Sequence, residues 1–405
     1  MKLVTGKVKI PDKDERLPLN LALVLDRSGS MHGEPLEYVK ESVSFVVDQV
    51  GADDFLSIVT FDNNVEVICP SQTVINNDNL KQVVKSISSG GTTNLSGGFL
   101  RGYKEVFEGA KSGQVNRIIL LTGGQANVGI TEPSLLTAKA KGMVDKGVSV
   151  STIGVGTSFN EDLLMMLAEA GQGHYYYVCN PDEIPGIFAE ELEGLLSVIA
   201  QAVSMSMEGL DGCRVTGVLG YEPVFSPTGA KIDLPDMYEN EVKILALKLE
   251  HPPFAPGEHD VFKLTLDYTG TTGNLDSVTL RVTAKLTASD GSDLLFEPNF
   301  EVIKVVELTR TALAKDEGAE AAGRGDFDTG RKVLKERLDA LNSLSSKAPR
   351  PDPQLDEEIS DLTVLLESMD RTSSQFVGDS ALGSQAFQKE LKYQSYQTRR
   401  SRPKK

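Results

Sequence analysis

Asp26, Ser28 and Ser30 follow the first strongly apolar run of the chain, LALVLD, at alternate positions. In a tight turn, this spacing brings one carboxylate and two hydroxyls to one side of a loop. Oxygen ligands of this kind suit Mg²⁺ or Mn²⁺ and are poor ligands for zinc. Thr93 can add a fourth oxygen from the run GGTTN at 90–94, whose glycines allow the backbone to approach closely. Taken by themselves, these residues favour an Asx turn and a helix cap without a metal, and the surrounding pattern is what favours a metal site.

The elements that position these side chains alternate between short apolar runs and amphipathic stretches from Leu19 to about Ala200. This alternation is typical of a doubly wound α/β sheet, in which ligands bind at the carboxyl ends of the strands. The link at 62–64 is short enough for a hairpin and predicts one antiparallel edge strand. Predicted strands are 19–26, 55–61, 65–69, 117–122, 148–156 and 174–178, and predicted helices are 35–50, 79–88, 95–112, 132–147, 160–170 and 181–201.

The remaining sequence divides by its periodicity into β-rich and helical parts. Apolar and polar residues alternate after Gln201, which predicts a β-sandwich over 202–303, and the alternating residues 1–17 are expected to supply it with a strand. The α/β domain, at 18–201, would then be inserted in the sandwich or followed by it. A helical hairpin and a third helix are expected over 304–378, and a flexible basic tail over 379–405. The tail could also fold back on the acidic body.

The residues at the predicted metal site resemble those of the von Willebrand factor A (VWA) domain family. Asp26, Ser28 and Ser30 match the Asp-x-Ser-x-Ser element of the family's metal-ion-dependent adhesion site (MIDAS), and Thr93 matches its distant threonine. The resemblance covers about residues 19–200 and implies a Rossmann-like fold. It also implies a Mg²⁺ or Mn²⁺ ion coordinated by these four residues, with an open position for a carboxylate of a partner.

One residue departs from the family pattern. The family usually has Leu-Leu-Thr-Asp-Gly, whereas this chain has Gly123 at the position of the aspartate. With Asp26 as the only carboxylate, a bound divalent cation keeps about one positive charge, so its intrinsic affinity should fall. Two interpretations stay open. The site either is weakened and still works through a partner's carboxylate, or has lost its metal and serves as a plain interaction surface.

Composition limits the classes of partner and compartment. The 405 residues carry 41 Lys and Arg against 58 Asp and Glu, a formal charge of −17, which makes nucleic acid a poor partner. Cys69, Cys179 and Cys213 form no Cys-x-x-Cys pair, so a reducing compartment is expected. No apolar run predicts a signal peptide or a transmembrane segment. We therefore expect a cytoplasmic protein.

The motifs favour binding over catalysis. The sequence has no Gly-x-x-x-x-Gly-Lys loop, no Gly-x-Ser-x-Gly elbow and no His-Glu-x-x-His, and its four histidines are scattered. We expect a non-enzymatic interaction or scaffolding module whose partner presents an exposed Asp or Glu. The resemblance points to bacterial multidomain VWA proteins. A metal-free scaffold, or a subunit that assists an ATPase in complex assembly or metal insertion, is the alternative.

Overall fold

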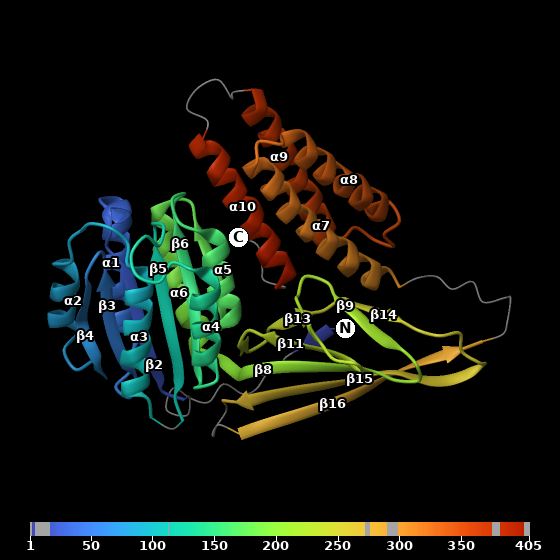
Figure 1. Cartoon of the computed structure of the whole chain (residues 1–405), viewed down its shortest axis with the longest axis horizontal. Helices are drawn as coiled ribbons and strands as arrows, with labels where there is room; N and C mark the ends of the chain where they lie inside the picture. The colour runs from blue at the N-terminus through green and yellow to red at the C-terminus, as the bar shows by residue number, and fades with distance from the viewer. Residues whose placement is uncertain are drawn as a thin grey trace.

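The computed structural model describes residues 2–4, 17–111, 113–271, 276–289, 299–374 and 381–400. These residues form three regions, which are an α/β domain, a β-rich region and a helical bundle (Figure 1). The bundle and the β-rich region both lie beside the α/β domain, so the domain contacts two neighbours from later parts of the chain.

A six-stranded sheet in the order β4-β3-β2-β5-β6-β7 forms the centre of the α/β domain. Strand β4 pairs antiparallel with β3 and all other pairs are parallel, which confirms the predicted antiparallel edge strand. Strands β2, β5 and β6 are buried along their whole length, as expected when helices cover both faces of a parallel sheet. Their bounds are β2 Leu19–Asp26, β3 Phe55–Phe61, β4 Val65–Thr73, β5 Val115–Thr122, β6 Val148–Val155 and β7 Gln172–Val178.

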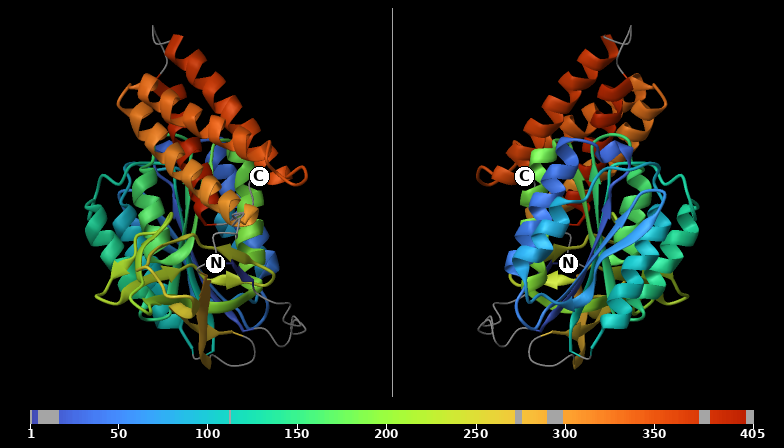
Figure 2. Two further views of the ribbon diagram at one scale, coloured as in Figure 1. Left: turned by 90° about the vertical axis from the view of Figure 1, so that its right-hand side faces the viewer. Right: turned by 90° about the vertical axis from the view of Figure 1, so that its left-hand side faces the viewer.

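Helices cover both faces of this sheet (Figure 2). One apolar core lies between the sheet and α1, α2 and α6, and a second lies between the sheet and α3, α4 and α5. Asn76, Asn94 and Asn160 each accept a hydrogen bond from a backbone N–H of the helix that they precede, which fixes where α2, α3 and α5 begin. The helices are α1 Glu34–Gln49, α2 Asn77–Lys85, α3 Leu95–Gly109, α4 Pro133–Val144, α5 Glu161–Ala170 and α6 Ile184–Leu196.

The boundary between the α/β domain and the β-rich region differs from the prediction. A helix was expected over 181–201, but a short 3-10 turn at Pro181–Glu183 leads into α6, which ends at Leu196, and strand β8 begins at Val198. The helix ends early because the burial pattern changes at Val198. From this residue onward buried and less buried residues alternate, which is the period of a strand. Val198 packs in the core of the α/β domain, and Val203 packs in the core of the β-rich region.

The β-rich region consists of antiparallel strands, as predicted. One sheet has the order β10-β11-β8-β15-β16 with β12 also paired to β8, and the β9–β14 pair packs against the same core. The expected sandwich is therefore uneven, with one large and one small sheet. Strand β1, Lys2–Val4, pairs with β13, whereas residues 5–16 lie outside the described part of the chain. The other strands are β8 Val198–Gly209, β9 Arg214–Val218, β10 Val224–Phe225, β11 Gly229–Leu234, β12 Met237–Tyr238, β13 Val242–Ile244, β14 Leu247–Glu250, β15 Gly257–Gly270 and β16 Asp276–Ala288.

Four helices form the C-terminal bundle, which are α7 Phe300–Gly323, α8 Phe327–Ser345, α9 Pro353–Ser374 and α10 Ala381–Arg399. The prediction of a flexible tail over 379–405 is wrong for 381–399. Helix α10 packs on α7 and reaches the α/β domain, where Lys389 pairs with Glu161 and Arg400, just past the helix, pairs with Glu169. The basic residues therefore bind the acidic body of the protein, because opposite charges on the two elements face each other.

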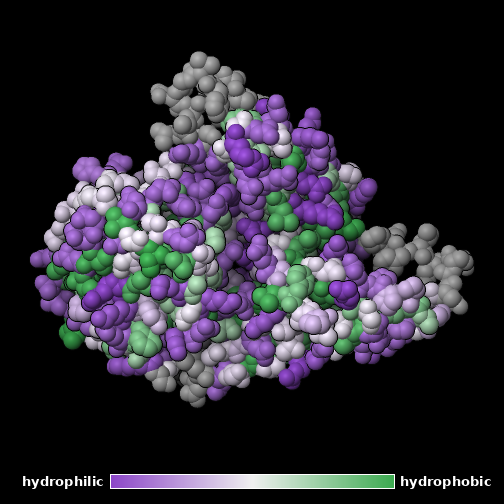
Figure 3. All heavy atoms as spheres, viewed as in Figure 1, coloured by the Kyte–Doolittle hydropathy of each residue, from purple (hydrophilic) through white to green (hydrophobic). Residues whose placement is uncertain are grey.

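The outer surface is mostly polar on the face shown in Figure 3, where hydrophilic side chains cover much of the area and apolar ones form small groups. None of the described helices has both the length and the apolar composition that are needed to cross a bilayer.

Candidate functional site

The predicted ligands lie at the carboxyl ends of the parallel strands. Asp26 is the last residue of β2, and Ser28 and Ser30 follow in the loop that leads to α1. Strand β2 is central in the sheet, flanked by β3 and β5, so the loops after all three strands surround this position. Asp26 and Ser28 are buried, whereas Ser30 is exposed, so the cluster opens to the surface on the side of Ser30.

Three hydroxyl groups converge on one point beside Gly124. A methyl group on Gly124 would lie 2.8 Å from Thr93 Oγ1, 3.0 Å from Ser30 Oγ and 3.6 Å from Ser28 Oγ, so the glycine leaves this space open between the oxygens. The two serine hydroxyls are 3.1 Å apart. Neighbouring ligands of an octahedral Mg²⁺ at about 2.1 Å lie about 3 Å apart. The oxygens present therefore fit a hard divalent cation.

The loop that carries Thr93 is fixed by backbone contacts with the loop after β2. Gly29 N donates to Gly91 O at 2.9 Å, and Gly90 N donates to Arg27 O at 2.6 Å. A side chain at position 90 would collide with Asp62, because its Cβ would lie 1.9 Å from Asp62 Oδ2. The glycines in the run at 90–94 thus allow the close approach that brings Thr93 to the site.

Asp26 is held by donors from its own loop and from β5. Its Oδ1 accepts from Ser28 N at 2.7 Å, and its Oδ2 accepts from Thr122 Oγ1 at 2.6 Å and from Gly123 N at 3.3 Å. Burial raises the pKa of Asp26, while hydrogen bonds from Ser28, Thr122 and Gly123 act in the opposite direction. A nearby cation would favour the ionised carboxylate in this buried position.

Gly123 lies beside the hydroxyl cluster, and the space for a side chain there is partly filled. A Cβ on Gly123 would be 3.5 Å from Ser30 Oγ but only 2.6 Å from Met31 Sδ. The buried Met31 thioether thus occupies volume that an aspartate at 123 would need. In the described part of the chain, no group of three or more His, Cys, Asp or Glu side chains is arranged to hold a metal. Any cation here would depend on hydroxyls and a single carboxylate.

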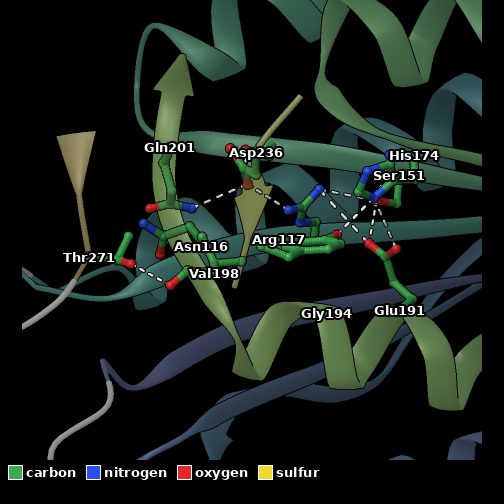
Figure 4. Close-up of polar contacts among 12 residues, drawn as sticks. Asn116, Arg117, Ser151, His174, Glu191, Gly194, Val198, Gln201, Asp236 and Thr271 are labelled. Carbon is green, nitrogen blue, oxygen red and sulfur yellow. Dashed lines mark hydrogen bonds and ion pairs between the residues drawn. The ribbon is translucent and has the colours of Figure 1, made fainter. Parts of the chain in front are cut away.

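Sequence analysis did not predict a second polar cluster, which joins the α/β domain to the β-rich region. In this cluster Arg117 of β5 donates to Asp236 Oδ2 at 2.6 Å and to Ser151 Oγ at 3.1 Å. Figure 4 shows Arg117 between Asp236 on one side and Ser151, His174 and Glu191 on the other. The predicted strand 117–122 was interpreted as apolar, and nothing near Arg117 in the sequence indicates its partner 119 residues later.

Glu191 of α6 is the second anion in this interdomain cluster. It accepts from Ser151 Oγ at 2.5 Å and from Tyr176 Oη at 2.7 Å, and its Oε2 lies 3.5 Å from His174 Nδ1. Burial raises the pKa of Glu191, but the hydrogen bond with His174 and the positive charge of Arg117 lower it by a larger amount. The pKa is therefore well below its ordinary value. The cluster therefore links β5, β6, β7 and α6 to the segment around β12.

Comparisons with known proteins agree with this architecture. A sequence model described as von Willebrand factor type A domain matches residues 20–190. The uncharacterized protein sll0103 of Synechocystis sp. is 30% identical over 270 residues, which are 64% of this chain and 64% of that protein. The uncharacterized protein YfbK of Escherichia coli is 31% identical over 199 residues, which are 48% of this chain and 35% of that protein. The chain thus spans less than two thirds of the length of either relative.

A solved structure extends the likeness in fold beyond the α/β domain. The structure titled von Willebrand factor type A from Catenulispora acidiphila matches 92% of this chain and 89% of its own, with a TM-score of 0.69 at 17% identity. This coverage includes the β-rich region and helices after the sheet. Residues 20–190 are a von Willebrand factor type A domain, to which this chain adds a β-rich region and C-terminal helices.

Proposed function

We propose that the VWA domain of this chain is a non-enzymatic protein-interaction module that binds Mg²⁺ or Mn²⁺. The hydroxyls of Ser28, Ser30 and Thr93 would hold the cation, and Asp26 would supply the negative charge behind them. The observation that carries the proposal is the space beside Gly124, toward which the three hydroxyl oxygens converge. When bound, the cation would offer an open coordination position to an Asp or Glu carboxylate of a protein partner.

The charge of the site favours an acidic partner. Asp26 is the carboxylate that hydrogen-bonds with Ser28, Thr122 and Gly123 beside the hydroxyl cluster, whereas the nearby Asp62 is paired with Arg27. A divalent cation beside a single carboxylate keeps about one positive charge, so a second carboxylate from outside gains Coulomb energy. The cation would therefore be held weakly in the free protein and more strongly in the complex.

The surroundings of the hydroxyls favour binding over catalysis. No described hydrogen bond joins the hydroxyl of Ser28, Ser30 or Thr93 to a histidine or lysine that could act as a general base. His32, the nearest histidine in sequence, is exposed and its Nδ1 contacts Ser89 Oγ at 2.9 Å. These contacts support a role for the hydroxyls as ligands.

Thermal unfolding with EDTA, Mg²⁺ or Mn²⁺ tests the proposal. With a dissociation constant of about 1 mM, 10 mM metal would stabilise the fold by about 1.4 kcal/mol, a rise of about 3–5 °C in the unfolding midpoint. Gly124→Ala should abolish the rise, because its methyl group would occupy the space between the hydroxyls. Gly142→Ala is the matched control, since a Cβ there meets nothing within 4 Å, and it should keep the rise.

If neither the natural chain nor Gly142→Ala responds to metal, while both unfold cooperatively in EDTA, the hydroxyl cluster is not a cation site. The VWA domain would then bind partners through a metal-free surface. If Gly124→Ala responds as strongly as the control, the metal binds elsewhere on the protein.

A further inference from the structure

Strand β16 is the last strand at one side of the larger sheet of the β-rich region (Figure 1). Among the described residues it pairs with β15 alone, so the backbone groups along its other side have no strand beside them. Such an edge presents a row of unpaired N–H and C=O groups that can pair with another chain. The strand has 13 residues and contains neither proline nor glycine, so nothing in its sequence interrupts pairing.

The other edges of the two six-stranded sheets are protected. On β4, the outer strand of the α/β domain, Ser71 N donates to Glu105 Oε2 at 3.1 Å, and Pro70 removes a donor from the row. At the opposite edge, Tyr175 N of β7 donates to Tyr396 Oη of α10. Strand β10 has two residues. In the described part of the chain, no side chain makes a hydrogen bond to the backbone of β16, so this edge is open.

Apolar side chains are exposed along one face of β16. Leu280, Val282 and Leu286 are 49%, 58% and 39% exposed. In the register with β15, Leu280 lies opposite Leu266 and Val282 lies opposite Leu264, which places both residues of β16 on the core side of the sheet. Leu264 and Leu266 are buried in that core, whereas no described residue of β16 belongs to it. The apolar row of β16 therefore lacks a neighbour on its outer side.

We propose that β16 pairs antiparallel with β16 of a second copy of this chain and forms a symmetric dimer. An interface of this kind is self-complementary, and association stops at two copies because the pairing occupies the open edge of both. The dimer needs no metal and goes beyond the proposed VWA function. Two paired copies would present two VWA domains to the same partner.

The length and the apolar face of β16 favour a two-fold axis at Val282, the middle residue of the strand. This register overlaps all 13 residues. Val282 then lies opposite Val282 of the other copy, and Leu280 lies opposite Ala284 on the same face. Side chains that are directly opposite on one face are close enough to pack. The exposed apolar row of one copy thus gains the apolar row of the other copy as its neighbour.

The charged residues on the other face of β16 disfavour the neighbouring registers. With the axis in the middle of the strand, Arg281 faces Thr283 of the other copy. Lys285 faces Thr279, so no like charges lie directly opposite each other. The two Arg281 side chains are diagonal neighbours and are exposed to solvent, which screens their charges. An axis at Arg281 would place two arginines directly opposite, and an axis at Thr283 would place Arg281 opposite Lys285.

Sedimentation equilibrium in EDTA tests the proposal, because a failed metal site cannot affect the result. The chain should change from monomer to dimer between about 1 and 300 µM, since a single strand pair is a small interface that supports a weak complex. Val282→Glu should raise the dissociation constant at least about tenfold, because two carboxylates would lie directly opposite each other. Val364→Glu on α9 is the matched control, since Val364 is 59% exposed, and it should dimerise like the natural chain.

A mixture of two charge variants separates a lost interface from a lost fold. Val282→Glu and Val282→Lys should each be monomeric alone, and their mixture should form a dimer, because opposite charges then face each other. This recovery requires that both variants are folded.

Disulfide formation tests the register of the pair. A Cys179→Ser background removes the exposed thiol, while Cys69 and Cys213 are buried. Val282→Cys should then give a covalent dimer with the mild oxidant diamide, because the two Cβ atoms would lie about 4.5–5.5 Å apart. Leu280→Cys is the control on the same face. Its two copies would lie about 13 Å apart along the strands, which is too far for a disulfide.

The proposal is overturned if the natural chain stays monomeric at about 300 µM, in which case the β16 edge is open to a different partner. It is also overturned if association continues beyond a dimer, if Val282→Glu and Val364→Glu behave alike, or if Leu280→Cys crosslinks as fast as Val282→Cys.

Discussion

Thr122 Oγ1 donates a 2.6 Å hydrogen bond to Asp26 Oδ2 from the end of the neighbouring strand. Strands β2 and β5 are in parallel register with Leu25 opposite Leu121, so the next residue of each strand meets at the edge of the sheet. The carboxylate of Asp26 is therefore oriented by the end of β5, although the loop after β5 has glycine rather than aspartate at position 123. The site keeps an oriented anion while carrying one negative charge.

Thr122→Val should destabilise the fold by about 1–3 kcal/mol, because the buried Asp26 carboxylate loses a donor and the isosteric valine replaces no hydrogen bond. Urea unfolding followed by circular dichroism measures the change. Thr131→Val, at an exposed position, is the control and should alter the unfolding free energy by less than about 0.5 kcal/mol. Equal effects of the two substitutions would show that the Thr122–Asp26 bond does not hold the carboxylate.

Arg117→Met should cost about 3–5 kcal/mol, because it leaves Asp236 without its charged partner in the interdomain cluster. Arg117→Met/Asp236→Leu should recover part of this loss, since both charges are then removed. Denaturant unfolding measures all three proteins. Lys104→Met, which breaks the exposed pair of Lys104 and Glu108, should cost less than about 1 kcal/mol. A double variant no more stable than Arg117→Met would argue against direct coupling.

Acid should weaken the interdomain cluster through Glu191. Its pKa in the folded protein lies below its ordinary value of 4.5, so its stabilising contribution is complete above about pH 4.5 and is lost as the pH falls toward the folded pKa. One such group gives a slope of up to about 1.4 kcal/mol per pH unit. Unfolding free energies measured from pH 6 to pH 3 should therefore fall less steeply in Glu191→Gln. Identical slopes would contradict the lowered pKa.

Tyr396→Phe should loosen α10 from the α/β domain. The Tyr396 hydroxyl accepts a 3.0 Å hydrogen bond from the backbone N of Tyr175, which is fully buried, so its loss should cost about 1–3 kcal/mol. Hydrogen exchange at the Tyr175 amide should become faster, and chemical denaturation gives the free energy. Tyr103→Phe, on α3, is the control because no hydrogen bond is described for its hydroxyl. Unchanged exchange at Tyr175 would contradict the contact.

The central sheet was predictable because its signals are local. Short apolar runs bounded by turn residues, such as 19–26, indicate buried strands from the local sequence, and Asp26, Ser28 and Ser30 lie at one strand end. The approach of Thr93 follows from glycines close to it in sequence. The metal-ligand role of these residues stays a prediction, because their placement shows converging oxygens and not a bound ion.

The parts that sequence analysis missed depend on distant partners. Residues 381–399 are polar and basic, and they suggested a solvated tail, yet Lys389 and Tyr396 contact Glu161 and Tyr175 more than 200 positions earlier. Arg117 similarly pairs with Asp236, which lies 119 residues later in the chain. The position of a helix or a buried charge that depends on such contacts cannot be inferred from its own periodicity.

The most direct test of the proposed metal site is a titration with Mn²⁺ monitored by electron paramagnetic resonance, which reports the free ion. We expect the natural chain to bind one Mn²⁺ weakly and Gly124→Ala to bind none at this site. Gly123→Asp should bind it at least about tenfold more tightly once Met31 shifts, because a second carboxylate is added beside Ser30. Identical titrations of the natural chain, Gly124→Ala and Gly123→Asp would contradict the assignment of Ser28, Ser30 and Thr93 as ligands.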